Sequence, residues 1–166
     1  YNGGAIELAD GSSATLVAIE FRENSAHRAG GALRVAESAE VSCTDCIFES
    51  NTADRGGAVD VAVDATYTDS GGQYIDNEAI EGDGGAIRVI NDGVLEISGA
   101  DFQGNEADSA GGALRVSGGA HEEYLATRER LFAHVEYGSA LTAELVEGEG
   151  GVERVGEPAL HCVDCF

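Results

Sequence analysis

Short alternations of apolar and polar residues recur along the chain, and each one directly follows a pair of glycines. The apolar members stand two and four residues after the second glycine, at Ile6 and Leu8, Leu33 and Val35, Val59 and Val61, Ile87 and Val89, and Leu114 and Val116. A period of two over so few residues is typical of a short strand with one buried face. Two further alternations follow in each unit, so the pattern predicts three short strands per repeat.

The repeat has a nearly constant length. Its glycine pairs end at Gly4, Gly31, Gly57, Gly85 and Gly112, so that one unit spans 26 to 28 residues. An aromatic residue stands 17 places after each of the first four of these glycines, at Phe21, Phe48, Tyr74 and Phe102. An asparagine stands 20 places after them, at Asn24, Asn51, Asn77 and Asn105. Only the stretch before the next glycine pair varies in length, which predicts a loop there.

A unit of this length cannot bury the inner faces of its strands alone, and it must therefore stack on copies of itself. Parallel strands of adjacent units would then lie about 4.8 Å apart. We predict an all-β fold for residues 1–166, a single right-handed parallel β-helix of about six coils with three short strands and 26–28 residues per coil. A leucine-rich repeat does not fit, because its leucine and asparagine spacing is absent.

Stacked coils would place equivalent side chains above one another. The aromatic residues would form a stack along the axis, and the asparagines would bond their amides from coil to coil. The glycine pairs would supply a corner that needs positive φ angles or close backbone approach. An alanine follows each of the five glycine pairs that define the repeat, and we expect it to face outward against a tight neighbour: Ala5, Ala32, Ala58, Ala86 and Ala113.

The combination of Gly-Gly-Ala followed by Ile, Leu or Val with Phe-x-x-Asn resembles the repeat of the polymorphic outer membrane proteins of chlamydiae and of related repeat proteins in other bacteria and in algae. The resemblance covers residues 3–116, with Tyr74 in place of the phenylalanine in one unit. It implies a surface-exposed right-handed β-helix, often adhesive, within a long secreted chain. Such a family is defined by its scaffold, so the resemblance indicates a fold rather than an activity.

The repeat breaks after Val116. Residues 117–138 carry Tyr124, Arg128, Leu131 and Val135 at helical spacing, and we expect this irregular, non-repeating insertion to be a short helix or a loop. A later glycine pair resumes the pattern. Neither end carries a recognisable cap, so we expect a segment of a longer chain or a unit of an end-to-end filament.

Charge narrows the range of partners. The chain has 31 acidic residues against 9 basic ones, and its net charge is -22. Such a charge repels nucleic acid and anionic membrane surfaces, and no apolar run approaches the roughly 20 residues of a membrane span. Other copies of the chain, other surface proteins and glycans remain as expected partners.

Four cysteines form two Cys-x-Asp-Cys pairs, Cys43 with Cys46 and Cys162 with Cys165. The pairs stand about four coils apart, roughly 20 Å at strand spacing, so they cannot share one zinc ion. Within a pair both side chains should point inward on either side of a bend, where a local disulfide fits. Disulfides indicate an oxidising compartment, and we therefore expect an extracellular or cell-surface location.

A ladder of charges is expected on the outer face of the first strand: Glu7, Arg34, Asp60, Arg88, Arg115 and Arg154. Opposite charges on adjacent coils would pair there, each pair contributing well under about 1 kcal/mol at the surface. A polysaccharide lyase with this fold would also place an acid, a base and an arginine on such a face. No carboxylate pair or histidine recurs at a fixed place beside the ladder, and we assign no catalytic residue.

Two other patterns indicate binding functions. Small hydroxyl residues form rows on the outer face of the second strand, which would suit an ice-binding face, but Val17 and Glu96 interrupt them. Acidic turns such as residues 91–93 would suit calcium, yet none matches a complete loop motif, and we assign no metal ligand or cofactor.

These observations predict a structural or adhesive extracellular repeat scaffold, a segment of a cell-surface stalk, adhesin or filament with no catalytic activity of its own. The alternative interpretation is a carbohydrate-binding or polysaccharide-cleaving β-helix, followed by the ice-binding face.

Overall fold

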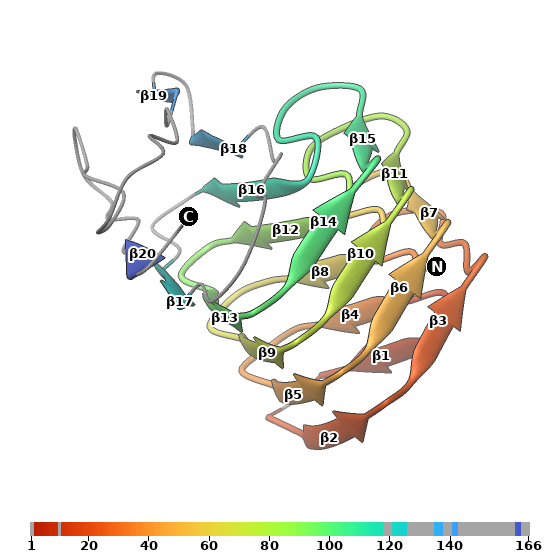
Figure 1. Ribbon diagram of the computed structural model, residues 1–166. Helices are drawn as coiled ribbons and strands as arrows, with labels where there is room; N and C mark the ends of the chain where they lie inside the picture. The colour runs from red at the N-terminus through yellow and green to blue at the C-terminus, as the bar shows by residue number, and fades with distance from the viewer. Residues whose placement is uncertain are drawn as a thin grey trace.

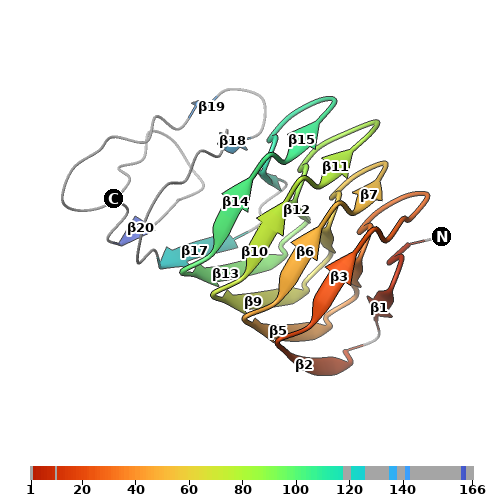
Figure 2. The same ribbon diagram turned by 45° about the vertical axis from the view of Figure 1, so that its right-hand side comes forward.

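The computed structural model describes residues 2–9 and 11–117, together with strand residues 121–125, 135–137, 141–142 and 162–163. This part of the chain is all-β and contains no helix. It forms a right-handed parallel β-helix of about four coils (Figures 1 and 2). The sequence predicts about six coils, and the units expected beyond Ser117 fall mostly on residues outside the described part.

Four sheets run along the axis, and successive coils contribute neighbouring strands to each (Figure 1). Sheet A contains β1 (Ile6–Leu8), β4 (Leu33–Val35), β8 (Val59–Val61), β12 (Ile87–Ile90), β16 (Leu114–Ser117), β18 (Val135–Tyr137) and the antiparallel β19 (Leu141–Thr142). Sheet B contains β2 (Ser13–Val17), β5 (Glu40–Thr44), β9 (Thr66–Ser70), β13 (Val94–Ser98), β17 (His121–Leu125) and β20 (Cys162–Val163).

Sheets C and D complete each coil. Sheet C contains β3 (Glu20–Arg22), β6 (Ile47–Glu49), β10 (Gln73–Ile75) and β14 (Asp101–Gln103). Sheet D contains the two-residue strands β7 (Thr52–Ala53), β11 (Glu78–Ala79) and β15 (Glu106–Ala107). The sequence predicts three strands per coil, and sheet D adds a fourth that directly follows the asparagine of the repeat.

The strands align without offset between coils. In sheet A, Leu33 lies opposite Ile6 on one side and Val59 on the other. Because successive side chains of a strand point to opposite faces, this register sends one set of apolar residues into the interior of every coil. The result is one continuous core of Leu, Val and Ile from sheets A and B, closed by the aromatic residues of sheet C.

The alanines that follow the repeat's glycine pairs belong to the core in all but the first coil, contrary to the prediction from the sequence. We expect these alanines to face outward, but Ala32, Ala58 and Ala86 are fully buried and Ala113 is nearly so. The chain still turns at this point, because the N–H groups of Ala32 and Leu33 both donate to the carbonyl oxygen of Ala58. The alternation of inward and outward side chains therefore starts at the residue after the alanine, such as Leu33, and not at the alanine itself. Ala5, in the first coil, is exposed.

The two glycines of a pair meet different requirements. Gly30, the first of its pair, has a φ of 65°, in the left-handed region that favours glycine. Gly31, the second, has a negative φ, but a Cβ atom on it would overlap the carbonyl oxygen of Gly57 in the next coil. The second glycines form a seam along which the coil backbones approach closely.

The span 117–138, where we expect a short helix or a loop, contains β17 and β18. β17 pairs in parallel with β13 in the register of the preceding coils, and β18 pairs in parallel with β16. The exposed backbone groups of the last regular coil thus gain strand partners. The rest of this span lies outside the described residues.

Candidate functional site

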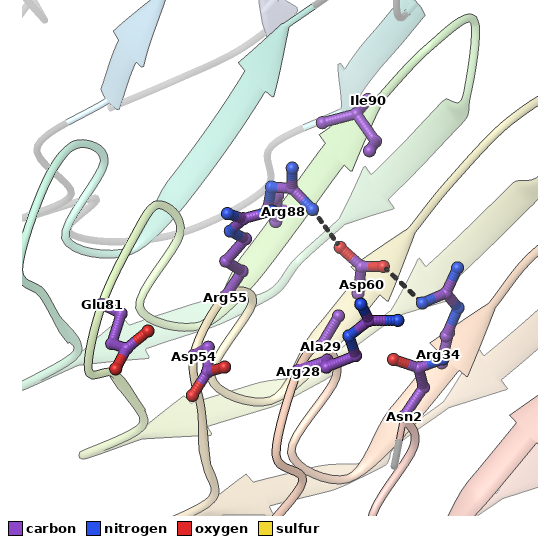
Figure 3. A pocket seen from close by; sticks show the side chains of 10 residues that line it. All are labelled: Asn2, Arg28, Ala29, Arg34, Asp54, Arg55, Asp60, Glu81, Arg88 and Ile90. Atoms are coloured by element: carbon purple, nitrogen blue, oxygen red, sulfur yellow. Dashed lines mark hydrogen bonds and ion pairs between the residues drawn. The ribbon is translucent and has the colours of Figure 1, made fainter.

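A groove of about 320 Å³ lies on the outer face of sheet A, beside the loops that follow sheet D (Figure 3). Strands β4, β8 and β12 present side chains to it, and the segments before four glycine pairs contribute the others. Its lining residues are Asn2, Arg28, Ala29, Arg34, Asp54, Arg55, Asp60, Glu81, Arg88 and Ile90. We refer to Arg28, Arg34, Arg55 and Arg88 as the groove arginines, and to Asp54 and Glu81 as the loop rim.

Asp60 lies at the centre of the groove, where strand register brings two arginines against it. Arg34 and Arg88 stand directly opposite Asp60 on the neighbouring strands β4 and β12. Arg88 Nη1 donates a hydrogen bond of 2.9 Å to Asp60 Oδ1, while Arg34 Nη1 lies 4.0 Å from Oδ2. One carboxylate is therefore shared between two guanidinium groups.

Asp60 is only 1% exposed, which makes it unlike a surface ion-pair partner. Burial raises the pKa of its carboxyl, and the guanidinium groups of Arg88, Arg34 and Arg55 offset only part of that rise. The sequence predicts an outward ladder of exposed charges. The Asp60 position departs from it because the loops beside sheet A and the two arginine side chains cover the carboxylate.

Of the other residues in the predicted charge ladder, only some pair with an opposite charge on the neighbouring strand. Arg34 Nε lies 3.6 Å from Glu7 Oε1, which extends the row to the first coil. Arg88 and Arg115 stand opposite each other as like charges, and Arg115 lies 4.0 Å from Asp83 in a loop. Arg154 is outside the described residues.

Arg28 and Arg55 complete the groove from the loop side, and the repeat pattern predicts neither. Each precedes a glycine pair, but at different distances from it, so neither follows the period of the strands. The sequence feature that could have indicated their proximity is an arginine in the loop before the glycine pair in two successive coils. Both are exposed, and within residues 2–9 and 11–117 neither side chain forms an ion pair or a hydrogen bond.

The asparagines form a continuous row inside the coil stack. The Nδ2 atom of each of Asn24, Asn51 and Asn77 donates to Oδ1 of the asparagine in the next coil at 2.9 Å. The backbone N–H of the same residues donates to the same Oδ1 atoms at 3.0 Å. Asn51 and Asn77 are fully buried, so these bonds are made where no water competes for them.

The aromatic residues of sheet C form a second row beside the asparagines. Ring centroids are 4.8 Å apart for Phe21 and Phe48, 4.9 Å for Phe48 and Tyr74, and 4.7 Å for Tyr74 and Phe102, with interplanar angles of 10°, 2° and 8°. The spacing is that of parallel strands, so the stacking follows directly from the register. Asn51 Nδ2 also donates to the carbonyl oxygen of Phe21, which ties the two rows together.

Cys43 and Cys46 form a disulfide across the bend between β5 and β6, and both are buried. Cys162 lies in β20, Cys165 is outside the described residues, and the second predicted disulfide therefore falls on the part of the chain that the structure does not describe.

A buried polar cluster occupies the same bend in the next coil. Asp69 takes the place of Cys43 in the register and is 1% exposed. Neither of its carboxylate oxygens has a hydrogen-bond partner of good geometry. Burial raises the pKa of this carboxyl to about 7, and the nearby Gly72 N–H and Tyr74 hydroxyl offset only part of the rise. The Tyr67 and Tyr74 hydroxyls lie 2.8 Å apart, and burial raises both of their pKa values well above 10.0.

The described residues give no support for metal chemistry or for a membrane helix. No group of three or more His, Cys, Asp or Glu side chains among them is arranged to hold a metal ion. The part of the chain that the structure describes also contains no helix long and apolar enough to span a membrane. The groove lining has no histidine, and its central carboxylate is engaged by arginines.

Comparison of the chain with protein-family models, with curated proteins and with solved structures gives no match. Its function is therefore inferred from its own sequence and geometry.

Proposed function

We propose that this repeat scaffold is a structural or adhesive segment of an extracellular or cell-surface protein, part of a stalk, adhesin or filament without catalytic activity of its own. The resemblance of its repeat to that of the polymorphic outer membrane proteins supports a surface role. The buried disulfide supports an oxidising compartment, because cytosolic thiols are kept reduced.

The observation that carries the proposal is the pair of rows inside the coils. The asparagine row bonds each coil to the next with both a backbone and a side-chain donor, and the aromatic row follows it at strand spacing. Pulling one coil away from its neighbour breaks all these contacts together with the sheet hydrogen bonds. Such a stack resists separation of its coils and holds its outer faces in fixed positions, which suits a stalk or a display surface.

Force spectroscopy on the chain, held at its two ends, tests the mechanical role. A coil of 26–28 residues that unfolds as a unit should lengthen the tether by about 9 nm. A series of force peaks at that spacing is the expected result. Extension of the whole β-helix at low force without separate peaks would contradict a mechanical role.

An antibody against the folded β-helix tests the location. Staining of intact source cells should equal that of permeabilised cells, whereas staining that requires permeabilisation would contradict a surface location. Incubation of the chain with acidic polysaccharides should leave their chain length unchanged, and shortening would favour the polysaccharide-cleaving alternative.

A further inference from the structure

We propose that the groove on sheet A binds an acidic oligosaccharide, with the groove arginines holding its uronate carboxylates and the loop rim accepting hydrogen bonds from its hydroxyl groups. This inference goes beyond the scaffold proposal, which does not depend on it.

The first argument is the concentration of positive charge. The groove collects four of the six arginines that lie within residues 2–9 and 11–117, in a chain with 31 acidic and 9 basic residues. Three carboxylates line it, of which only Asp60 is engaged by the groove arginines. Figure 3 shows Arg28 and Arg55 reaching from the loops toward the Asp60 cluster, while the loop rim lies apart on the other side. Like charges gathered in this way favour an added anion.

The second argument is the number of donors left without acceptors. Within the described residues, Arg88 is the one groove arginine whose guanidinium donates a hydrogen bond to an acceptor. Arg34 has charge partners at 3.6 Å and 4.0 Å, beyond hydrogen-bond distance, and the Nε atoms of Arg34 and Arg88 are buried without a hydrogen-bond partner. The guanidinium groups of Arg28 and Arg55 are exposed and have no acceptor among the described residues, so an incoming carboxylate would accept hydrogen bonds from donors that the protein leaves unmatched.

The third argument concerns the chemistry of the ligand. A planar guanidinium matches a carboxylate in bidentate geometry, and exposed Arg28 and Arg55 are both free to present that fork. The loop rim would repel a dense polyanion such as nucleic acid, but it would accept hydrogen bonds from hydroxyl groups. A uronate oligosaccharide combines these features, because single carboxylates alternate with several hydroxyls along it.

The shape of the groove agrees with a chain ligand. On sheet A, Arg34 and Arg88 lie on either side of Asp60, two strand spacings or about 9.6 Å apart, and Arg28 and Arg55 come from the loops of successive coils, so a linear ligand lying along the axis meets several of them in turn. The lining includes no aromatic side chain, so stacking of a neutral sugar on an aromatic face is not available. Carboxylate groups on the ligand are therefore needed for recognition.

Isothermal titration calorimetry of the whole chain with oligogalacturonate tests the proposal. We expect saturable binding that weakens as salt is added, and no binding of a neutral oligosaccharide of equal length. The double variant Arg28→Gln with Arg55→Gln should bind at least about tenfold more weakly, because it loses two charged forks. Both residues are exposed, so the variant should keep the circular dichroism spectrum and melting temperature of the parent.

The matched control is Arg22→Gln. Arg22 is an exposed arginine of β3 that pairs with Glu20 and Glu49 on sheet C, away from the groove lining. Its substitution should leave oligogalacturonate binding unchanged. Absence of saturable binding, or equal weakening by the control, would overturn the proposal. Equally tight binding of an oligoglutamate peptide would also overturn it and would assign the groove to acidic peptides.

Discussion

Replacement of Asn51 by alanine should destabilise the β-helix more than the same substitution at the end of the asparagine row. The Asn51 side chain takes part in four hydrogen bonds: it accepts from the N–H and Nδ2 of Asn24 and donates to Asn77 Oδ1 and to the Phe21 carbonyl oxygen. At about 1 kcal/mol for each, Asn51→Ala should lower the free energy of unfolding by about 4 kcal/mol. That is a large share of the roughly 5–15 kcal/mol of an ordinary domain.

Asn24→Ala is the matched control, because the Asn24 side chain takes part in only one hydrogen bond among the described residues. Its expected cost is about 1 kcal/mol. Urea unfolding followed by circular dichroism, with parent and variants at the same pH, measures the difference of about 3 kcal/mol between the two variants. Equal destabilisation by both substitutions would refute the idea that the bonds between asparagines hold the coils together.

Two further predictions concern the core and the glycine seam. Asp69 has its pKa raised from 3.8 to about 7, so the folded state favours the protonated form. The contribution of Asp69 to the free energy of unfolding should be greatest below pH 4 and should fall by up to about 4 kcal/mol as the pH rises to 7. Urea unfolding at several pH values measures this fall as a decrease in the midpoint concentration. The variant Asp69→Asn should abolish it. Gly31→Ala should cost about 3 kcal/mol or more, because the new Cβ overlaps the backbone of the next coil. Gly11→Ala is the control, because the nearest atom to a Cβ there is 3.9 Å away, and the substitution should cost about 1 kcal/mol from the φ of 66° alone. Similar melting temperatures for the two variants would contradict the close backbone approach along the glycine seam.

At the bend between sheets B and C the coils share one backbone register but carry different side chains. The second coil closes this bend with the disulfide between Cys43 and Cys46, and the third places Asp69 and Gly72 at the equivalent positions. A Cβ on Gly72 would overlap the Asp69 carboxylate, so the glycine makes room for the acid. The backbone register stays the same while the chemistry at the bend changes from coil to coil.

The groove illustrates the limit of a periodic pattern. The sequence predicts that Arg34, Asp60 and Arg88 share a face, because each stands three residues after a glycine pair. It does not predict that Arg28 and Arg55 join them, because the loops before the glycine pairs vary in length and carry no fixed spacing. The pattern also does not predict the burial of Asp60, since a position that alternates outward on a strand is covered here by side chains from the loops and neighbouring coils.

The sequence by itself determined the coil, its length and the residues that stack from one coil to the next. These properties follow from local features, namely the alternation with a period of two, the glycine pair and the asparagine, which recur together at a nearly constant spacing. Only the tertiary structure decided that the alanines belong to the core, that Asp60 and Asp69 are buried, and that arginines from separate loops meet in one groove. Burial and convergence depend on neighbours one coil away in space, and a pattern read along the chain does not contain those neighbours.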